Sequence, residues 1–123
     1  MNKNSNDRER RQQAAFEKLG TTEPRCGTCG YNDWRALERH HVGQGRFDET
    51  CVIVCRNCHR RLSDDQRDHP PPLPTDAPNL FEQVGHFLLG LADLFRILVE
   101  KLIEFGLLLI AHAPTEQRKE PKP

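Results

Sequence analysis

The sequence predicts a small α+β fold organised around a metal site, with an N-terminal helix and a long amphipathic C-terminal helix. Two Cys-x-x-Cys pairs bracket a segment that has two short strand patterns and few bulky aliphatic residues. A proline-rich run then precedes a long helical pattern. A length of 123 residues suits one small domain with appendages, which fits this arrangement.

Charge is balanced over the whole chain, with 18 basic and 18 acidic side chains. The segment 70–113 is acidic, and the remainder carries a thin positive excess. The segment 70–113 has two basic residues, Arg96 and Lys101. Its five acidic residues are Asp76, Glu82, Asp93, Glu100 and Glu104. Global charge therefore neither favours nor excludes a nucleic-acid partner.

Residues 1–24 are expected to form an N-terminal arm. A short helix is predicted over 7–19, because the segment holds good helix formers and Gly20 stands where a helix favours a stop. Its apolar content is slight, so it either packs by one narrow stripe or stays a solvated arm. No apolar stretch follows Met1, so no export signal is predicted.

The segment 25–69 holds two Cys-x-x-Cys pairs about 25 residues apart, Cys26 with Cys29 and Cys55 with Cys58. A two-residue gap lets both sulfurs of a turn point at one ion, and two such turns supply the four tetrahedral ligands that Zn²⁺ prefers. Four thiolates leave no open position, so this zinc is predicted to be structural. A segment so poor in aliphatic residues needs such a metal to fold.

The fifth cysteine, Cys51, is left over and is interpreted as a buried strand residue. An odd count, paired spacing and no export signal favour metal-bound thiolates in a reducing cytoplasm over disulfides. A redox Cys-x-x-Cys pair is the alternative, but it would need a βαβ context that the sequence does not show.

A His-His pair lies between the cysteine pairs, within the strand pattern that precedes the glycine-rich turn 43–47. Adjacent strand residues point to opposite faces, so His40 and His41 cannot share one role. A strand is predicted over 51–54 and a helix over 56–66. Successive helix residues diverge by about 100°, so Cys58 can face zinc while His59 faces a second site. Two imidazoles can hold a divalent ion and a third can act as a general base, although a strand histidine is often only a half-buried polar residue.

Three motifs together resemble the HNH endonuclease family in its zinc-bound ββα-metal form. They are Cys26-x-x-Cys29, Leu37-Glu-x-His-His-Val42 and Cys55-Arg-Asn-Cys-His-Arg-Arg-Leu-Ser63. The resemblance covers about a third of the chain, residues 25–69. It implies a ββα-metal finger and a metal-dependent endonuclease that hydrolyses DNA phosphodiester bonds.

The resemblance also implies residue roles. His41 matches the general base that deprotonates the attacking water. His40 and His59 match the ligands of the catalytic Mg²⁺ or other divalent ion. Three arginines are candidate phosphate contacts, with ordinary solvated side chains as the alternative: Arg46, Arg60 and Arg61.

One position departs from the family pattern. The family usually has Asn just before the second strand, five positions ahead of the second Cys-x-x-Cys, and this chain has Thr50 there. That Asn pins the loop between the strands and so orients the base, whereas Thr lacks the paired donor and acceptor of an amide. The alternative function is a catalytically weak or inactive zinc-stabilised module that binds DNA or protein.

The proline-rich segment 70–79 is expected to be an extended linker. Asn79 with Glu82 three residues later resembles a helix capping box. One amphipathic helix, or two broken near Gly90, is predicted over 80–113, and Pro114 opens a charged tail, 114–123.

The apolar face of the segment 80–113 is wider than a lone surface helix requires. Its uninterrupted apolar runs, 87–92 and 105–111, are far shorter than the roughly twenty residues of a membrane span. Its polar side is mostly acidic, which does not suit a membrane surface. The segment is therefore expected to cover the small core or to form a homodimer.

Overall fold

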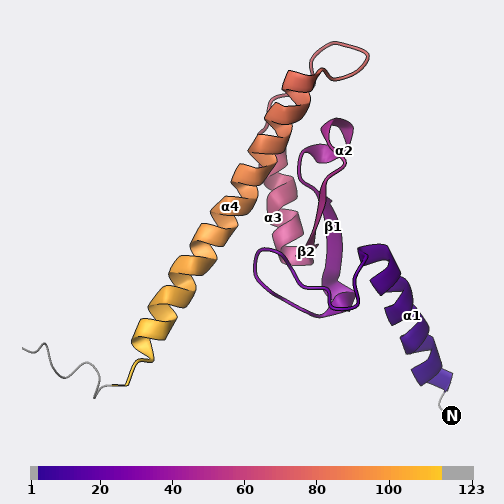
Figure 1. Cartoon of the computed structure of the whole chain (residues 1–123), viewed down its shortest axis with the longest axis vertical. Coiled ribbons are helices and arrows are strands. Elements are labelled where there is room, and N and C mark those ends of the chain that lie inside the picture. Colours follow the sequence, from indigo (N-terminus) through magenta and orange to yellow (C-terminus); the bar gives the residue numbers. More distant parts are fainter. Residues whose placement is uncertain (1–2, 115–123) are drawn as a thin grey trace, which may run out of the picture.

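The computed structural model describes residues 3–114 (Figure 1). Within this range a two-stranded antiparallel sheet and the helix after it lie between an N-terminal helix and a long C-terminal one. The prediction of a small α+β fold with these elements and a four-cysteine cluster is confirmed. The expected charged tail lies, from residue 115 on, outside the described residues.

The sheet pairs β1 (Leu37–His41) with β2 (Cys51–Cys55), and Leu37 lies opposite Cys55 while His41 lies opposite Cys51. The connection between the strands contains the short helix α2 (Gln44–Phe47). Helix α3 (Arg56–Gln66) begins directly after β2, at the residue where the sequence predicts it. A strand–helix junction at Cys55 places the second cysteine pair at the base of the hairpin.

Helix α1 (Lys3–Leu19) begins about one turn before the predicted start at residue 7. It ends where predicted, because Gly20 takes a positive φ and its amide donates to the Phe16 carbonyl at 2.8 Å. Leu19 packs against the core, whereas most of the helix surface is exposed. The helix projects from the remainder of the fold near the short 3₁₀ helix η1 (Trp34–Ala36) (Figure 1).

The hydrophobic core lies between the hairpin, α3 and the N-terminal half of α4 (Leu80–Ala111). Its most enclosed side chains are Val42, Val54, Leu62 and Ile97. Three of the ten buried hydrophobic residues are cysteines of the two pairs, so the aliphatic core is very small. Such a core offers little burial energy of its own, which supports the need for a metal.

Helix α4 runs unbroken for 32 residues, so the alternative of a break at Gly90 is wrong. Gly90 is instead the point where α4 meets the hairpin, since a Cβ there would overlap the Val42 carbonyl. The Asn79 side chain caps the helix by accepting from the Glu82 amide at 2.8 Å. The Glu82 carboxylate accepts from the Leu73 amide in the proline-rich segment, where a capping box would have it accept from the Asn79 amide.

A polar cluster joins the end of α3 to α4. The Nε2 of His69 lies 2.8 Å from the Asp93 carboxylate, and both side chains are buried. The ring of His86 stacks on Phe47 of α2 with centroids 3.8 Å apart. These contacts and the Gly90 approach fix α4 against the hairpin. No helix in residues 3–114 combines the length and hydropathy needed to cross a membrane.

Candidate metal centre and histidine cluster

The four paired cysteines come together as the spacing predicts. Their Sγ atoms all lie within 4.8 Å of one another, and Cys29 Sγ is 3.7 Å from Cys55 Sγ. A zinc tetrahedron with bonds of about 2.3 Å has edges of about 3.8 Å, so this spacing fits a four-thiolate zinc site. Nothing else in residues 3–114 brings three His, Cys, Asp or Glu ligand atoms this close.

The first cysteine pair lies on a tight turn that is fastened to the sheet. Gly30 adopts a positive φ, and its amide donates to the Cys26 carbonyl at 2.9 Å. The Gly27 amide donates to the Ile53 carbonyl of β2 at 2.7 Å. The turn therefore holds its sulfurs beside the junction of β2 with α3, where the second pair lies.

The electrostatics of the cluster suit a bound cation. Burial tends to raise the pKa of the Cys26 thiol, but hydrogen bonds to the Thr28 hydroxyl and to nearby backbone lower that pKa to about 6. Burial raises the pKa of the Cys58 thiol to about 12. Cys26 is thus set up as a thiolate near neutral pH, whereas Cys58 needs a bound metal ion to release its proton.

His40 and His59 form a second cluster, on the other side of the junction. Their rings meet edge to face with centroids 5.2 Å apart, His40 from β1 and His59 from α3. The Glu38 carboxylate lies 2.6 Å from His59 Nδ1, which leaves Nε2 as the nitrogen that Glu38 does not engage. A carboxylate behind a histidine fixes the ring and strengthens its other nitrogen as a metal ligand.

Burial lowers the pKa of His40 to about 4, and the charges of His59 and His41 lower it in the same direction. The ring of His40 is therefore neutral at pH 7, as an imidazole must be to bind a metal.

His41 points away from that cluster. His40 is buried while His41 is exposed, as the alternation of a strand predicts. A Cβ added at Gly45 in α2 would lie 3.8 Å from the His41 ring. The structure thus places His40 with His59 and leaves His41 on the solvent side of the hairpin.

The side chain of Thr50 makes a hydrogen bond within the loop between the strands. The hydroxyl of Thr50 donates to Asp48 at 3.1 Å, and its backbone carbonyl accepts from the Val42 amide. The amide of Gln66 donates to the carbonyls of His41 at 2.9 Å and Val42 at 3.3 Å. Gln66 therefore supplies a side-chain anchor at the end of β1.

Sequence reasoning missed Glu38 and Gln66, although each carries a signal. Glu38 lies two residues before His40, and strand alternation places the two on one face. Gln66 lies seven residues after His59, two helical turns along the same face of α3. Glu38 is part of the Leu37–Val42 motif, whereas Gln66 lies beyond Ser63, the last residue of the third motif. Strand and helix projections could have assigned both residues to the histidine cluster.

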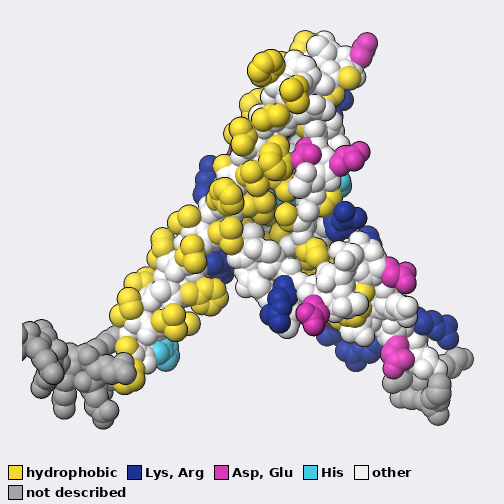
Figure 2. All heavy atoms as spheres, viewed as in Figure 1, with side chains coloured by type: hydrophobic (Ala, Val, Ile, Leu, Met, Phe, Trp, Pro, Cys, Tyr) yellow, Lys and Arg dark blue, Asp and Glu magenta, His cyan; other side chains and the backbone are white. Residues whose placement is uncertain are grey.

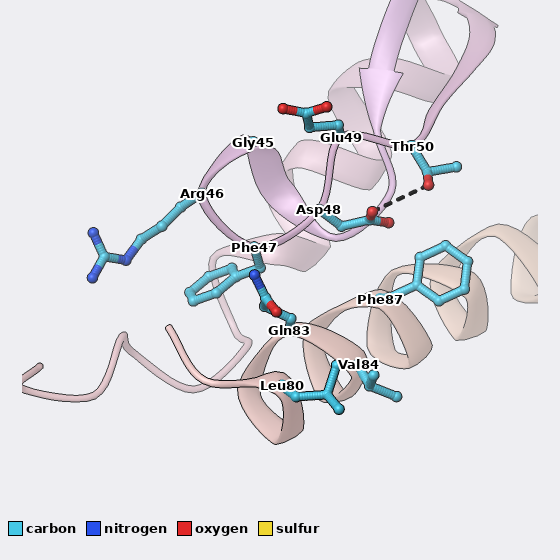
Figure 3. Close-up of a pocket in the computed structure, with 10 residues that line it drawn as sticks. All are labelled: Gly45, Arg46, Phe47, Asp48, Glu49, Thr50, Leu80, Gln83, Val84 and Phe87. Carbon is cyan, nitrogen blue, oxygen red and sulfur yellow. Dashed lines mark hydrogen bonds between the residues drawn. The ribbon is translucent and has the colours of Figure 1, made fainter. Parts of the chain in front are cut away.

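The three predicted arginine contacts have different surroundings. Arg46 is exposed and lines a groove of about 590 Å³ between the 45–50 loop and the start of α4, with its guanidinium extending outward (Figure 3). Arg61 pairs with Glu100 of α4 at 2.6 Å, so it ties α3 to α4. Arg60 is exposed beside Arg61 and Arg67 at an open hollow on α3.

Comparisons with family models, with curated proteins and with solved structures find no match. The resemblance to the HNH family therefore rests on the motif residues of this chain and on their arrangement.

Proposed function

We propose that this chain is an HNH-type endonuclease that hydrolyses DNA phosphodiester bonds with one divalent ion. The observation that carries the proposal is the pairing of His40 with His59, backed by Glu38, on a hairpin and helix joined by a four-cysteine cluster. Zn²⁺ would be held by the cysteines, and Mg²⁺ or another divalent ion by the two imidazoles. Two protein ligands leave room for the waters and phosphate oxygens that Mg²⁺ usually keeps.

In the proposed mechanism His41 accepts a proton from water as the water oxygen attacks the phosphorus. His41 is exposed on the opposite face of β1 from His40, so the mechanism requires the phosphate to reach past the edge of the hairpin from the ion to this ring. The bond to the 3′-oxygen breaks as the new P–O bond forms. A divalent ion at His40 and His59 would offset the charge on the phosphate and on the departing oxygen. Arg46 and Arg60 are exposed cations that can contact neighbouring phosphates.

The alternative is a zinc-stabilised module that binds DNA or protein without turnover. It is favoured by Thr50, whose exposed side chain bonds Asp48 and makes no contact with His41 among the described hydrogen bonds. It is also favoured by the commitment of Arg61 to Glu100. The hydrogen bond from Gln66 to the His41 carbonyl favours the endonuclease, because Gln66 can hold the backbone of His41 in place of the family's Asn.

Replacing the proposed base tests the function directly. We expect His41→Ala to reduce Mg²⁺- or Mn²⁺-dependent nicking of supercoiled plasmid by roughly 10²- to 10⁴-fold, the usual contribution of a general base. Zinc content should stay at one ion per chain, because His41 is outside the cysteine cluster. His112→Ala is the matched control, since His112 lies at the far end of α4, and it should nick like the wild type.

Equal nicking by wild type and His41→Ala would remove His41 from the mechanism. Binding to DNA by both proteins without any nicking would instead support the binding module.

Removing the carboxylate that contacts His59 should weaken binding of the catalytic ion more than it lowers the stability of the fold. We expect Glu38→Gln to raise the Mg²⁺ or Mn²⁺ concentration for half-maximal nicking by about 10- to 100-fold, because His59 loses the group that orients it. The lost ion pair with Arg56 is exposed and contributes little. An unchanged half-maximal concentration, at unchanged zinc content, would exclude this role for Glu38.

A further inference from the structure

Helix α4 has two apolar faces, and the core uses only one of them. His86, Gly90, Asp93, Leu94 and Ile97 are its buried residues, and they lie along the side that meets the hairpin and α3. The other side is exposed, and beyond Lys101 the helix extends away from the rest of the fold (Figure 1). Hydrophobic side chains follow α4 along its whole length on the face in view (Figure 2).

The exposed face carries an unbroken heptad pattern. Starting at Phe81 and stepping alternately by three and four residues, every position through Leu109 is apolar. We call these residues the seam: Phe81, Val84, Leu88, Leu91, Phe95, Leu98, Leu102, Phe105 and Leu109. Apolar residues at both positions of four successive heptads are the pattern by which two helices pack together in a coiled coil.

Helix geometry places the seam on the side of α4 away from the core. At about 100° per residue, the centre of the seam lies roughly 120° around the helix from Gly90 and roughly 140° from Ile97. Leu91 and Leu98 are half-buried at its edge, and the other seven seam residues are exposed. The seam is therefore available to a partner while α4 stays docked on its own core.

The exposed area matches what a stable pair of chains needs. The seven exposed seam residues retain 47–90% of their accessible surface. With full side-chain areas on the order of 150–200 Å², they offer roughly 800 Å² per chain. A standard protein–protein interface buries about the same area on each partner.

The chemistry of the seam selects the kind of partner. The positions beside it at heptad spacing are small or apolar: Gly85, Ala92, Val99 and Gly106. A Cβ added at Gly85 or Gly106 would meet nothing within 4 Å, so a second backbone can approach closely there. The charged residues of α4 are mostly acidic, which does not suit nucleic acid or an anionic membrane. The seam of a second copy, in contrast, has the same apolar heptad spacing, so the side chains of two seams can pack against each other.

We propose that the seam of α4 is a dimer interface that takes the α4 helix of a second copy of this chain. The proposal rests on α4 alone and does not depend on nuclease activity. Because Gly90 and Ile97 lie roughly 120–140° around α4 from the seam, with Leu91 at the boundary, the two hairpin modules would lie on the outer sides of the paired helices. A homodimer of this kind presents two histidine clusters on one particle.

The mass of the zinc-loaded full chain in solution tests the interface. We expect light scattering or sedimentation to give about twice the chain mass of 14.2 kDa for the wild type, and one chain mass for Leu102→Lys. Leu102 is 71% exposed, so a lysine there should disrupt the contact between two seams and leave the fold of the chain intact. Leu107→Lys is the matched control. Leu107 is 64% exposed and also lies beyond Lys101, on the side of α4 opposite the seam, so this variant should remain dimeric.

Three results would overturn the proposal. The first is a monomeric wild type at 100-micromolar concentrations, on the order of the Kd of a very weak complex. The second is dissociation of Leu107→Lys to the same extent as Leu102→Lys, which would indicate unspecific apolar association. The third is a monomer that floats with phosphatidylcholine vesicles, which would assign the seam to a lipid surface. Unchanged zinc content in both variants shows that the fold is intact, and nicking is measured separately.

Discussion

Replacing Cys58 by Ser should unfold the hairpin and α3 at room temperature. Structural zinc sites contribute roughly 10–16 kcal/mol of binding free energy to folding, and a chain with so small a core has little to offset its loss. Cys58 is buried within the four-sulfur cluster, and serine is not among the side chains that bind zinc in structural sites. Metal analysis should give one zinc per wild-type chain and none for the variant.

Amide hydrogen exchange is the right readout for the fold, because α4 can stay partly helical by itself. We expect protection in β1, β2 and α3 of the wild type and its loss in Cys58→Ser or after treatment with a strong chelator. Cys51→Ser is the matched control. Cys51 lies on β2 outside the cluster, half-buried where the sequence predicted a buried residue, and its thiol donates a hydrogen bond to the Glu49 carbonyl, so zinc and protection should both persist.

A Cys58→Ser protein that keeps the protection of the wild type would show that the cysteine cluster does not hold the fold. Loss of protection in Cys51→Ser to the same degree would point to general thiol chemistry instead of a metal site.

The parts of the fold that could be predicted are those that depend on residues close together in the sequence. The gap within each cysteine pair dictates that both sulfurs of a turn converge, and strand alternation separates His40 from His41. The position of α3 follows from the end of the strand pattern before Arg56 and from the proline run that begins at Pro70, although six of its eleven residues are weak helix formers. Helix ends without a strong cap are less certain, and α1 begins a turn early because the residues before Asp7 contain no helix breaker.

The parts that could not be predicted depend on contacts between distant segments. Arg61 matches a phosphate contact of the family, but the docked α4 brings Glu100 to it from 39 residues away. The anchoring role of Gln66 needs the end of α3 to reach the end of β1. Gly90 resembles a helix breaker in sequence, and only the packing of α4 on Val42 gives it another meaning.

Substituting Gly90 by Ala should destabilise the zinc-loaded protein, although the same change usually strengthens a helix. The added Cβ would overlap the carbonyl of Val42, and a backbone carbonyl cannot rotate away as a flexible side chain can. Helix α4 must then move off the hairpin and uncover Leu94 and Ile97. We expect a loss of about 3 kcal/mol or more in the free energy of unfolding, at the upper end for overpacked cores.

Gly85→Ala provides the control within the docked half of the same helix. A Cβ there meets nothing within 4 Å, so the intrinsic preference for Ala should raise stability by up to about 1 kcal/mol. Denaturant unfolding of both variants with zinc bound gives the comparison. If α4 were not docked at Gly90, both substitutions would stabilise the chain alike. Opposite signs can arise only if the Gly90 backbone lies against Val42, because the chemical change and the helix are the same.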